Sequence, residues 1–180
     1  MGDWMDLGDC NSPRVRIEFA TIAGQRPGLI AELLGLSYAE LVESDSLWIP
    51  EREKWEEFDR DVFDHPDTVG ACVFLTKVGG RIAGFGSWDP RPAPEYVIIG
   101  HNCILPEFRG RGLGRKQIEE ILRRFRGLGA RTAIVSTNDS PFFIPAQCMY
   151  ISCGFREVGR TPWEPDPTQS IIEYEMDIGP

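Results

Sequence analysis

The sequence has no long apolar run and no secretory leader pattern. No stretch comes near the ~18 consecutive apolar residues that a membrane-spanning helix needs. Residues 1–11 contain Asp3, Asp6 and Asp9, and they have neither the basic start nor the apolar centre of a signal peptide. These absences predict a cytoplasmic protein that is not bound to a membrane.

Metal ligands and paired cysteines are also scarce. The chain has two histidines, and its five cysteines are odd in number and scattered through mostly apolar segments. This usage is typical of reduced thiols that pack as small hydrophobic side chains. Cys148 and Cys153 are not spaced as zinc ligands are, and neither His65 nor His101 completes a ligand set. The sequence therefore predicts neither a disulfide framework nor a metal site.

Positive charge is in deficit except in one segment. Lysine and arginine number 19 against 28 aspartates and glutamates, a formal net charge of −9. Residues 107–131 hold eight of the basic residues and only three acidic ones. A nucleic-acid-binding protein needs a broad basic face, whereas a small polyanion needs only one such concentration of charge. The distribution argues against a nucleic-acid partner and favours a small phosphate-bearing ligand.

The length and composition fit a single core. The chain has 180 residues, of which 42% are hydrophobic and 26% are charged. These values are typical of one globular domain. No internal repeat or linker divides the sequence, so we expect a tail at residues 1–13 and a single domain at residues 14–180.

The hydrophobic periodicity predicts a mixed α/β protein in which helices cover a sheet. Two β-rich runs flank Gly79-Gly80, which is a strong hairpin signal, and three prolines in residues 89–94 predict a loop. The predicted strands are residues 14–20, 70–78, 81–88, 95–105, 132–137, 155–161 and 171–177. The predicted helices are residues 27–41 (one helix or two short ones, with Gly35 as the break), 50–63, 113–128 and 145–152.

The most informative segment is the run Arg109-Gly110-Arg111-Gly112-Leu113-Gly114, between a predicted strand and an amphipathic helix. Glycines at alternate positions let the backbone turn sharply and bring several N–H groups to one ligand, with no Cβ in the way. The helix adds unpaired N–H groups and the positive end of its dipole, worth about 0.3–1 kcal/mol to a nearby anion. This arrangement favours a phosphate-bearing cofactor.

Two common phosphate-binding motifs fail on spacing. A P-loop needs Gly-Lys-Ser/Thr, but Gly114 is followed by Arg115, Lys116 and Gln117. A dinucleotide fingerprint needs Gly-x-Gly-x-x-Gly in the first βαβ unit, whereas this turn reads Gly-x-Gly-x-Gly and lies past the middle of the chain. The hypothesis of a nucleotide-binding protein therefore rests on the glycine turn alone.

The remaining pattern, Arg109-x-x-Gly112-x-Gly114 between a strand and a helix, resembles the signature of the GNAT-type (general control/histone-acetyltransferase-related) N-acetyltransferase superfamily. A second match, Ala146-x-x-x-Tyr150-x-x-x-Gly154-Phe155, is similar to its closing helix and turn. The resemblance covers residues 14–177 and is strongest over residues 96–159. It implies the GNAT-like acyl-CoA acyltransferase fold: a single central, mostly antiparallel sheet of about seven strands, splayed between the fourth and fifth, with about four flanking helices.

The same resemblance implies an acetyl-CoA-dependent N-acyltransferase that moves acetyl from its co-substrate, acetyl-CoA, to a primary amine by direct attack in a ternary complex. A central-strand N–H near Cys103 or Leu105 is the implied donor to the carbonyl oxygen. Asn138 lies eight residues before Ala146 instead of about three, which departs from the superfamily's pattern. The implied cofactor-binding residues are Ile104, Leu105, Arg109, Gly110, Arg111, Gly112, Leu113, Gly114, Arg115 and Asn138.

Two residues are candidates for catalysis. The resemblance places Tyr150 beside the coenzyme sulfur, where a tyrosine of pKa near 10 can protonate a thiolate of pKa near 8.5; packing under the cofactor is the alternative role. The strand position that often holds a glutamate base is Gly100. His101 is a secondary candidate base because histidine titrates near neutrality, with a buried structural histidine as the alternative.

The amine acceptor, a small molecule or a peptide, is the least defined part of this prediction. Acidic residues and two tryptophans are candidates to attract a cationic amine, although surface solvation explains them equally well. Phe142 and Phe143 are candidates to line its pocket, with packing as the alternative. The candidate acceptor contacts are Glu40, Glu43, Asp45, Trp48, Trp88 and Asp89.

The absent strand glutamate leaves a non-catalytic acyl-CoA-binding module as the alternative function. Stoichiometric binding of coenzyme A without turnover would distinguish such a module from an enzyme. The exposed edges of the predicted hairpins are compatible with a homodimer.

Overall fold

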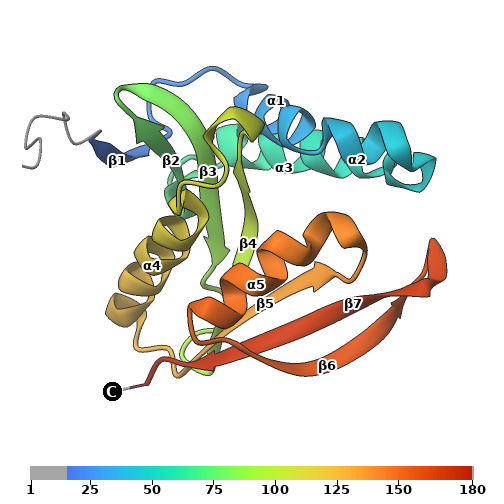
Figure 1. Cartoon of the computed structure of the whole chain (residues 1–180). Coiled ribbons are helices and arrows are strands. Elements are labelled where there is room, and N and C mark those ends of the chain that lie inside the picture. Colours follow the sequence, from blue (N-terminus) through green and yellow to red (C-terminus); the bar gives the residue numbers. More distant parts are fainter. Residues whose placement is uncertain (1–15, 180) are drawn as a thin grey trace, which may run out of the picture.

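The β-rich runs of the sequence assemble into one seven-stranded sheet in the order β1-β2-β3-β4-β5-β7-β6 (Figure 1). The computed structural model describes residues 16–179, so the predicted tail at residues 1–13 lies outside the described residues. The Gly79 and Gly80 turn joins β2 to β3 with φ of 57° and 82°, which confirms the predicted hairpin. The strands are β1 (Ile17–Thr21), β2 (Val73–Val78), β3 (Arg81–Asp89), β4 (Tyr96–Ile104), β5 (Thr132–Asn138), β6 (Arg156–Trp163) and β7 (Asp166–Asp177).

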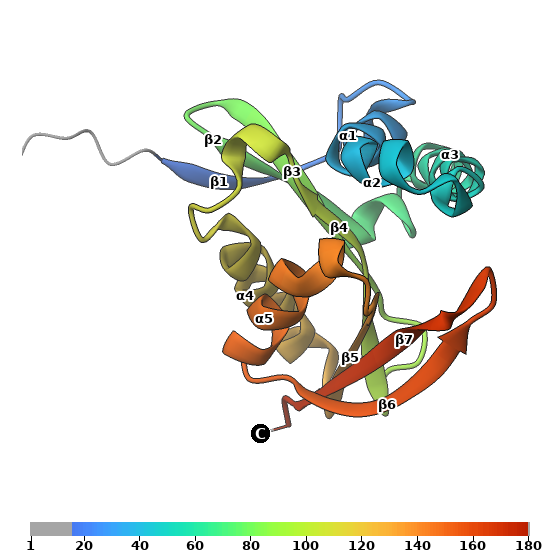
Figure 2. The same ribbon diagram turned by 45° about the vertical axis from the view of Figure 1, so that its right-hand side comes forward.

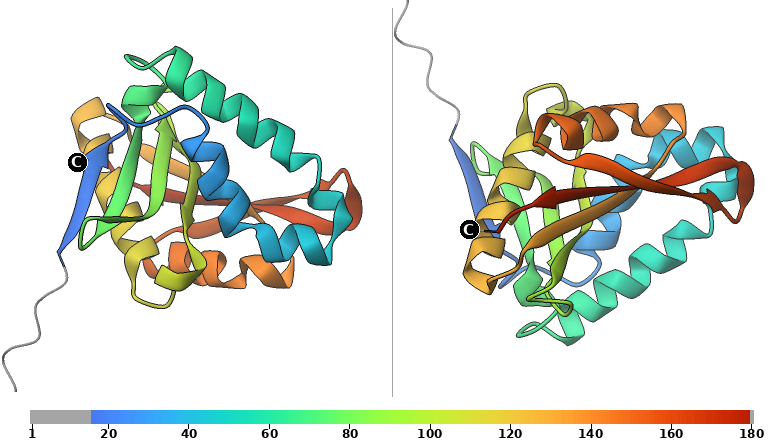
Figure 3. Two further views of the ribbon diagram at one scale, coloured as in Figure 1. Left: turned by 90° about the horizontal axis from the view of Figure 1, so that it is seen from above. Right: turned by 90° about the horizontal axis from the view of Figure 1, so that it is seen from below.

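Helices cover both faces of the sheet, because each buries one apolar stripe against it. On one face, Leu34 and Val62 belong to the core under the first three helices; on the other, Ile121 and Tyr150 belong to the core under the last two (Figure 3). This confirms the mixed α/β fold. The helices are α1 (Leu29–Ser37), α2 (Ala39–Ser44), α3 (Glu51–Asp64), α4 (Leu113–Phe125) and α5 (Ile144–Ser152).

The sheet opens between β4 and β5, which are its only parallel neighbours among residues 16–179. These two strands pair over three residues, from Tyr96 opposite Thr132 to Ile98 opposite Ile134. Beyond Ile98 they diverge, and Figure 2 shows the resulting gap in the ribbon beside α5. The remaining edge of β4 faces this split, as the resemblance implied.

A buried carboxylate sets the position of α1. The helix begins after Gly28 and has no side-chain cap of its own. Asp59 of α3 supplies the cap, because its carboxylate accepts hydrogen bonds from the backbone N–H groups of Gly28 (2.7 Å), Ile30 (2.8 Å) and Ala31 (3.3 Å). This contact fixes α1 to α3 and so determines where α1 ends, at Ser37 and Tyr38.

Several predicted boundaries were wrong. The strand predicted from residue 70 begins at Val73, after a short 3-10 helix at residues 70–72. Gly35 does not break the first helix; it lies inside α1, and the break falls at Tyr38. Leu33 and Leu34 are buried on the sheet, so packing outweighs the helix cost of one glycine. The last strand begins at Asp166 instead of residue 171, because β6 and β7 continue as a long hairpin that pairs out to Trp163 and Asp166.

Candidate active site

Each glycine of the turn before α4 has a separate structural reason. Gly110 and Gly112 have φ of 73° and 72°, in the left-handed region that other residues enter only at a cost. Gly114 has an ordinary φ but lies where α4 meets α5, and a Cβ there would come within 2.7 Å of the sulfur of Met149. The turn thus needs glycine twice for backbone conformation and once for close helix packing.

This turn leaves a continuous run of backbone donors without partners. Within residues 16–179, no acceptor is found for the backbone N–H groups of residues 110–115. The first backbone bond of the helix is the one that Lys116 N–H donates to the carbonyl of Gly112, at 3.2 Å. Six consecutive N–H groups at the positive end of a 13-residue helix form a site for an anion such as a diphosphate.

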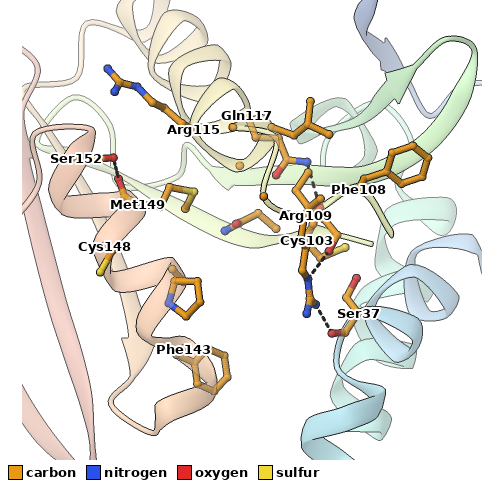
Figure 4. A pocket seen from close by; sticks show the side chains of 18 of the residues that line it. Ser37, Cys103, Phe108, Arg109, Arg115, Gln117, Phe143, Cys148, Met149 and Ser152 are labelled. Atoms are coloured by element: carbon orange, nitrogen blue, oxygen red, sulfur yellow. Dashed lines mark hydrogen bonds between the residues drawn. The ribbon is translucent and has the colours of Figure 1, made fainter. Parts of the chain in front are cut away.

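A cavity of about 570 Å³ lies against these donors, between the start of α4, α5 and the end of α1 (Figure 4). Ser37, Tyr38 and Gln117 also line it, although no sequence pattern indicates them as site residues. The predicted cofactor residues that line this cavity are Ile104, Arg109, Gly110, Gly112, Leu113, Gly114 and Arg115.

The side chains of three predicted cofactor residues lie elsewhere. Leu105 is buried in the core on the α1 side. The guanidinium of Arg111 lies over the Phe108 ring at 5.7 Å. Asn138 is buried at the end of β5, where its Oδ1 accepts the Ser140 N–H at 2.7 Å. None of the three lines the 570 Å³ cavity.

Arg109 lines the cavity but uses its side chain as a clamp. The guanidinium donates to the carbonyl of Ile104 at 3.1 Å and to the carbonyl of Ser37 at 2.5 Å, which ties β4 to the end of α1 (Figure 4). On the other side of β4, the buried Gln117 donates to the carbonyl of Cys103 at 3.2 Å. The end of β4 is therefore held both by α4, through Gln117, and by the end of α1, through Arg109.

The backbone N–H that β4 offers to the carbonyl oxygen of the thioester differs from the predicted one. The Leu105 N–H donates to the Ala83 carbonyl of β3 at 2.8 Å, so it is not available to a ligand. Successive N–H groups of a strand point to opposite sides, which directs the Cys103 N–H toward β3 as well and the Ile104 N–H toward the split. Ile104, not Cys103 or Leu105, therefore offers its N–H to the cleft.

Tyr150 lies in a second cavity of about 320 Å³, inside the split between β4 and β5. Its side chain is 4% exposed, and its hydroxyl accepts a hydrogen bond from Asn102 Nδ2 at 3.2 Å. Burial raises the pKa of Tyr150 above its usual value of 10 and outweighs the opposing bond from Asn102. The hydroxyl is thus a neutral proton donor throughout the physiological range.

The two cavities meet at a common wall made of Tyr38, Asn102, Phe143 and Ala146. Burial raises the pKa of Tyr38 strongly, and nearby Cys103 and Tyr150 add to the effect. A hydroxyl that stays protonated beside Tyr150 is a further polar group at this junction. Tyr38 is there because α1 ends beside the split, which its position in the sequence does not reveal.

His101 lies at a bulge where β4 slips in register against β3, between Ile99 and Asn102. Its ring packs on Phe58 of α3 with centroids 4.9 Å apart, and it lines the second cavity. Although His101 is partly exposed to solvent, desolvation of its ring by the surrounding protein lowers its pKa; Glu51 raises the pKa in part, and Lys54 lowers it further. The imidazole is therefore neutral at pH 7, the form that a base requires.

The strand position without a glutamate is tightly enclosed. A Cβ on Gly100 would lie 2.7 Å from the hydroxyl oxygen of Ser87, and that hydroxyl donates to the carbonyl of His101 at 2.7 Å. A longer side chain at position 100 would have to displace Ser87 from this bond. The glycine thus accompanies a bulge that brings His101, instead of a carboxylate, to the cleft.

The predicted acceptor contacts divide into separate places. Phe142 and Phe143 both line the 570 Å³ cavity, and Phe143 also lines the second one. Trp48 stacks on Trp163 of the β6–β7 hairpin at 4.6 Å. Trp88 and Asp89 line a third cavity. The predicted acidic contacts in α2 and at its end line none of the three cavities; these residues are Glu40, Glu43 and Asp45.

Residues 16–179 contain neither a cluster of metal ligands nor a membrane-spanning helix. No cluster of three or more His, Cys, Asp or Glu side chains is arranged to hold a metal ion. No helix in this part of the chain is long and apolar enough to cross a membrane.

Comparison with known proteins agrees with this site. The sequence model of the acetyltransferase (GNAT) family matches residues 37–155. The N-alpha-acetyltransferase RimI of Mycobacterium tuberculosis is 32% identical over 124 residues, which cover 67% of this chain and 69% of that protein.

Solved structures show the same fold. A putative GNAT-family acetyltransferase from Desulfovibrio desulfuricans superposes with a TM-score of 0.71 and 19% identity, over 92% of this chain and 99% of that one. The putative acetyltransferase yncA of Salmonella typhimurium, solved with its cofactor acetyl-CoA, superposes with a TM-score of 0.59 and 18% identity, over 91% of this chain and 94% of that one.

The fold and the site define an acyl-CoA-dependent acyltransferase. The chain belongs to the GNAT acetyltransferase family. It is an acetyl-CoA-dependent N-acetyltransferase, which confirms the predicted family, fold, activity and co-substrate. The unpaired N–H groups of residues 110–115 and the 570 Å³ cavity beside them fit that co-substrate.

Proposed function

We propose that this enzyme transfers acetyl from acetyl-CoA directly to a primary amine while both substrates are bound. The observation that carries the proposal is the junction of two cavities: the anion-binding cavity shares Tyr38, Asn102, Phe143 and Ala146 with the cavity that contains the Tyr150 hydroxyl. A donor held in the first cavity thereby reaches an acid and a base in the second. Direct transfer then needs no covalent enzyme intermediate.

The backbone N–H groups of residues 110–115 bind the diphosphate, and Arg109 keeps this turn in place through its bonds to Ile104 and Ser37. Arg115 adds positive charge at the cavity wall. The exposed edge of β4 at Ile104 orients the arm that carries the thioester, by the main-chain bonds that an unpaired strand offers. Asn138, Leu105 and Arg111 support the surrounding backbone.

Acetyl transfer breaks a C–S bond and forms a C–N bond; two protons leave the acceptor nitrogen, one is added to the sulfur, and one proton is released to solvent overall. The ammonium group of the acceptor gives up one proton before attack, and the nitrogen gives up the second as the amide forms. The sulfur leaves as a thiolate and takes one proton from Tyr150, whose raised pKa keeps it protonated until that moment. The hydroxyl is then reprotonated from solvent.

His101 receives a proton from the acceptor nitrogen, directly or through one water molecule. Support for this role comes from its place in the 320 Å³ cavity and from its lowered pKa, which keeps the ring neutral at pH 7. The Ile104 N–H faces the split and stabilises the negative charge that develops on the carbonyl oxygen.

The acceptor is an amine, as the family requires; its identity is part of the proposal. The relative from M. tuberculosis is named for N-alpha-acetylation, which favours a protein N-terminus, whereas the closed cleft of this chain favours a small amine. Residues 14–180 act as one domain in this proposal, and a homodimer through the sheet edges β1 or β6 stays a prediction.

A thiol-release assay across chemically diverse amines tests this function. The purified chain is mixed with acetyl-CoA and each amine, free thiol is followed by colour development, and the acetylated amine is identified by mass spectrometry. We expect one thiol for each acetylated amine. Saturable coenzyme A binding without thiol release from any amine would instead favour an acyl-CoA-binding module.

A further inference from the structure

A third cavity, of about 610 Å³, lies on the α3 side of β4. Its walls come from α3, the segment that follows α3, and the end of β3, and they combine an apolar surface with carboxylates. The apolar walls include Phe58, Val69 and Trp88. The carboxylates are Asp61, Asp67 and Asp89.

This cavity borders the one that contains Tyr150. The second and third cavities share Gly100 and His101 at the bulge of β4, just as the first and second share Tyr38 and Asn102. The three cavities therefore form one series that starts at the glycine turn, passes through the split between β4 and β5, and ends beside α3. His101 lies at the boundary between the second and third.

Aromatic packing closes the cleft on the side of the β6–β7 hairpin. Trp163 of the hairpin stacks on Trp48 at 4.6 Å, and Trp48 packs on Phe143 at 5.2 Å. All three side chains are buried, and Phe143 is a wall of the second cavity. An acceptor that extends along the hairpin would have to displace this cluster, whereas the third cavity borders the cleft at Gly100 and His101.

The charges at the two ends of the series are opposite. The first cavity is lined by Arg109 and Arg115 and by no acidic side chain. In the third, Arg91 neutralises Asp89 through bonds of 2.6 to 3.0 Å. The other two carboxylates of this cavity, Asp61 and Asp67, are exposed. Within residues 16–179, neither side chain forms a hydrogen bond or an ion pair.

We propose that the third cavity binds the acceptor, and that the acceptor is a small primary amine with an apolar chain and a second cationic group. The reacting amine passes His101 into the second cavity, the chain lies against Phe58 and Trp88, and the second cation is paired with Asp61 and Asp67 at the rim. The inference rests on the proposed function because it names the substrate class of that same site.

Three amines of equal length test the charge requirement: hexane-1,6-diamine, hexylamine and 6-aminohexanoate. We expect kcat/KM to fall in that order, with about a tenfold preference for the diamine over hexylamine, since two exposed ion pairs supply an effect of this size. The double variant Asp61→Asn, Asp67→Asn abolishes this preference by lowering kcat/KM for the diamine to about that for hexylamine.

A matched double variant controls for net charge. Glu56→Gln with Glu57→Gln removes the same charge from exposed positions of the same helix, and neither residue lines any of the three cavities. It keeps the preference for the diamine. If it loses the preference to the same extent as the aspartate variant, long-range charge accounts for the effect and the proposed cavity is wrong.

Calorimetric titration of hexane-1,6-diamine into the enzyme saturated with coenzyme A separates the two proposals. Binding that weakens about tenfold in the aspartate variant supports the third cavity, even where no amine releases thiol and the proposed function fails. Equal affinity in both proteins, or no binding at all, overturns the inference. So does thiol release that proceeds equally well with all three amines, which leaves the proposed transferase intact.

Discussion

The two ends of the cleft recognise their ligands by different means. At the donor end, which binds acetyl-CoA, the backbone N–H groups of residues 110–115 supply the binding groups. Glycines at 110 and 112 allow the backbone conformation that exposes these N–H groups. At the other end, the third cavity is built from side chains of α3, β3 and β4, which are far apart in the sequence. Recognition by the backbone leaves a local motif in a sequence; recognition by assembled side chains leaves none.

The contrast also has a chemical side. A diphosphate is common to every reaction of an acetyl-CoA-dependent enzyme, so its site depends on a rigid turn and a helix terminus. The acceptor site instead depends on separate side chains such as Asp61 and Trp88, which substitution can alter one at a time without disturbing the turn. Substitutions that affect only one end of the cleft, or only the chemistry between its ends, test whether binding of acetyl-CoA and binding of the acceptor can be altered separately.

The largest expected effect is at the junction of the cavities. Tyr150→Phe removes the proton donor to the leaving thiolate, and we expect kcat to fall by about 100- to 1000-fold, as for a lost general acid. Coenzyme A affinity should stay within about twofold, because the hydroxyl is in the second cavity and the N–H groups that hold the diphosphate belong to the first. Steady-state kinetics with calorimetry measures both.

Tyr174→Phe is the matched control. The ring of Tyr174 lies 6.0 Å from that of Tyr150 and is fully buried, but it lines none of the three cavities. Its kcat should match that of the unmodified enzyme. Equal rates for both variants would remove Tyr150 from the chemistry and leave it a packing role.

The next effect is confined to the donor end. Gly112→Asp places a Cβ at a φ of 72° and a carboxylate beside the diphosphate, so we expect coenzyme A affinity to fall on the order of 100-fold. Gly127→Asp makes the same substitution past the far end of α4, at an exposed glycine without positive φ, and should bind normally. Isothermal titration compares the two, and unaltered binding by Gly112→Asp would contradict the assigned diphosphate site.

A third prediction concerns the stability of the helix that carries Tyr38 to the cleft. Asp59→Ala removes the acceptor for three backbone N–H groups at the start of α1, and we expect a loss of about 2–3 kcal/mol in the free energy of unfolding. Asp64→Ala, at the exposed end of the same helix, should change it by less than about 0.5 kcal/mol. Urea denaturation measures both, and coincident transitions would show that Asp59 does not hold α1.

The smallest effect is a pH dependence. Desolvation lowers the pKa of His101 in the folded enzyme below its unfolded value of about 6.5, so activity should reach its plateau by pH 7 and fall as the ring is protonated at lower pH. Because the unfolded chain then binds more protons than the native one, the free energy of unfolding also decreases as pH falls below about 6.5.

His101→Gln should lower kcat a few-fold and flatten the acid side of both profiles. His65→Gln, at an exposed position outside the three cavities, is its control. Profiles of kcat/KM and of urea midpoint from pH 5 to pH 8 make the comparison. An acid limb that persists unchanged in His101→Gln would assign it to another group.

Most of the fold was predictable because its signals are local. The Gly79-Gly80 hairpin and the amphipathic helix after the glycine turn each depend on neighbouring residues, and both are present. Gly35 failed as a helix break because burial of α1 on the sheet outweighed its propensity. Predictions from local pattern thus failed where tertiary packing opposed them.

The candidate site was predictable in the same uneven way. The sequence pointed to the glycine turn and to Tyr150, but it did not show that Arg109 clamps two elements or that Leu105 donates to β3. Tyr38 and Gln117 escaped notice because an isolated tyrosine or glutamine carries no pattern. The role of each of these residues depends on which strand or helix lies opposite it, and only the folded chain determines that neighbour.

The sequence by itself identified the turn that exposes six N–H groups, because glycine enters the left-handed φ region seen at Gly110 and Gly112 without the strain that other residues meet there. Only the tertiary structure decided which side of β4 is open, where Tyr38 and His101 meet the cleft, and that Asp61 and Asp67 stand at its far end. Those placements require strands and helices distant in sequence to pack together, and the free energy that selects them comes from burial of the shared core.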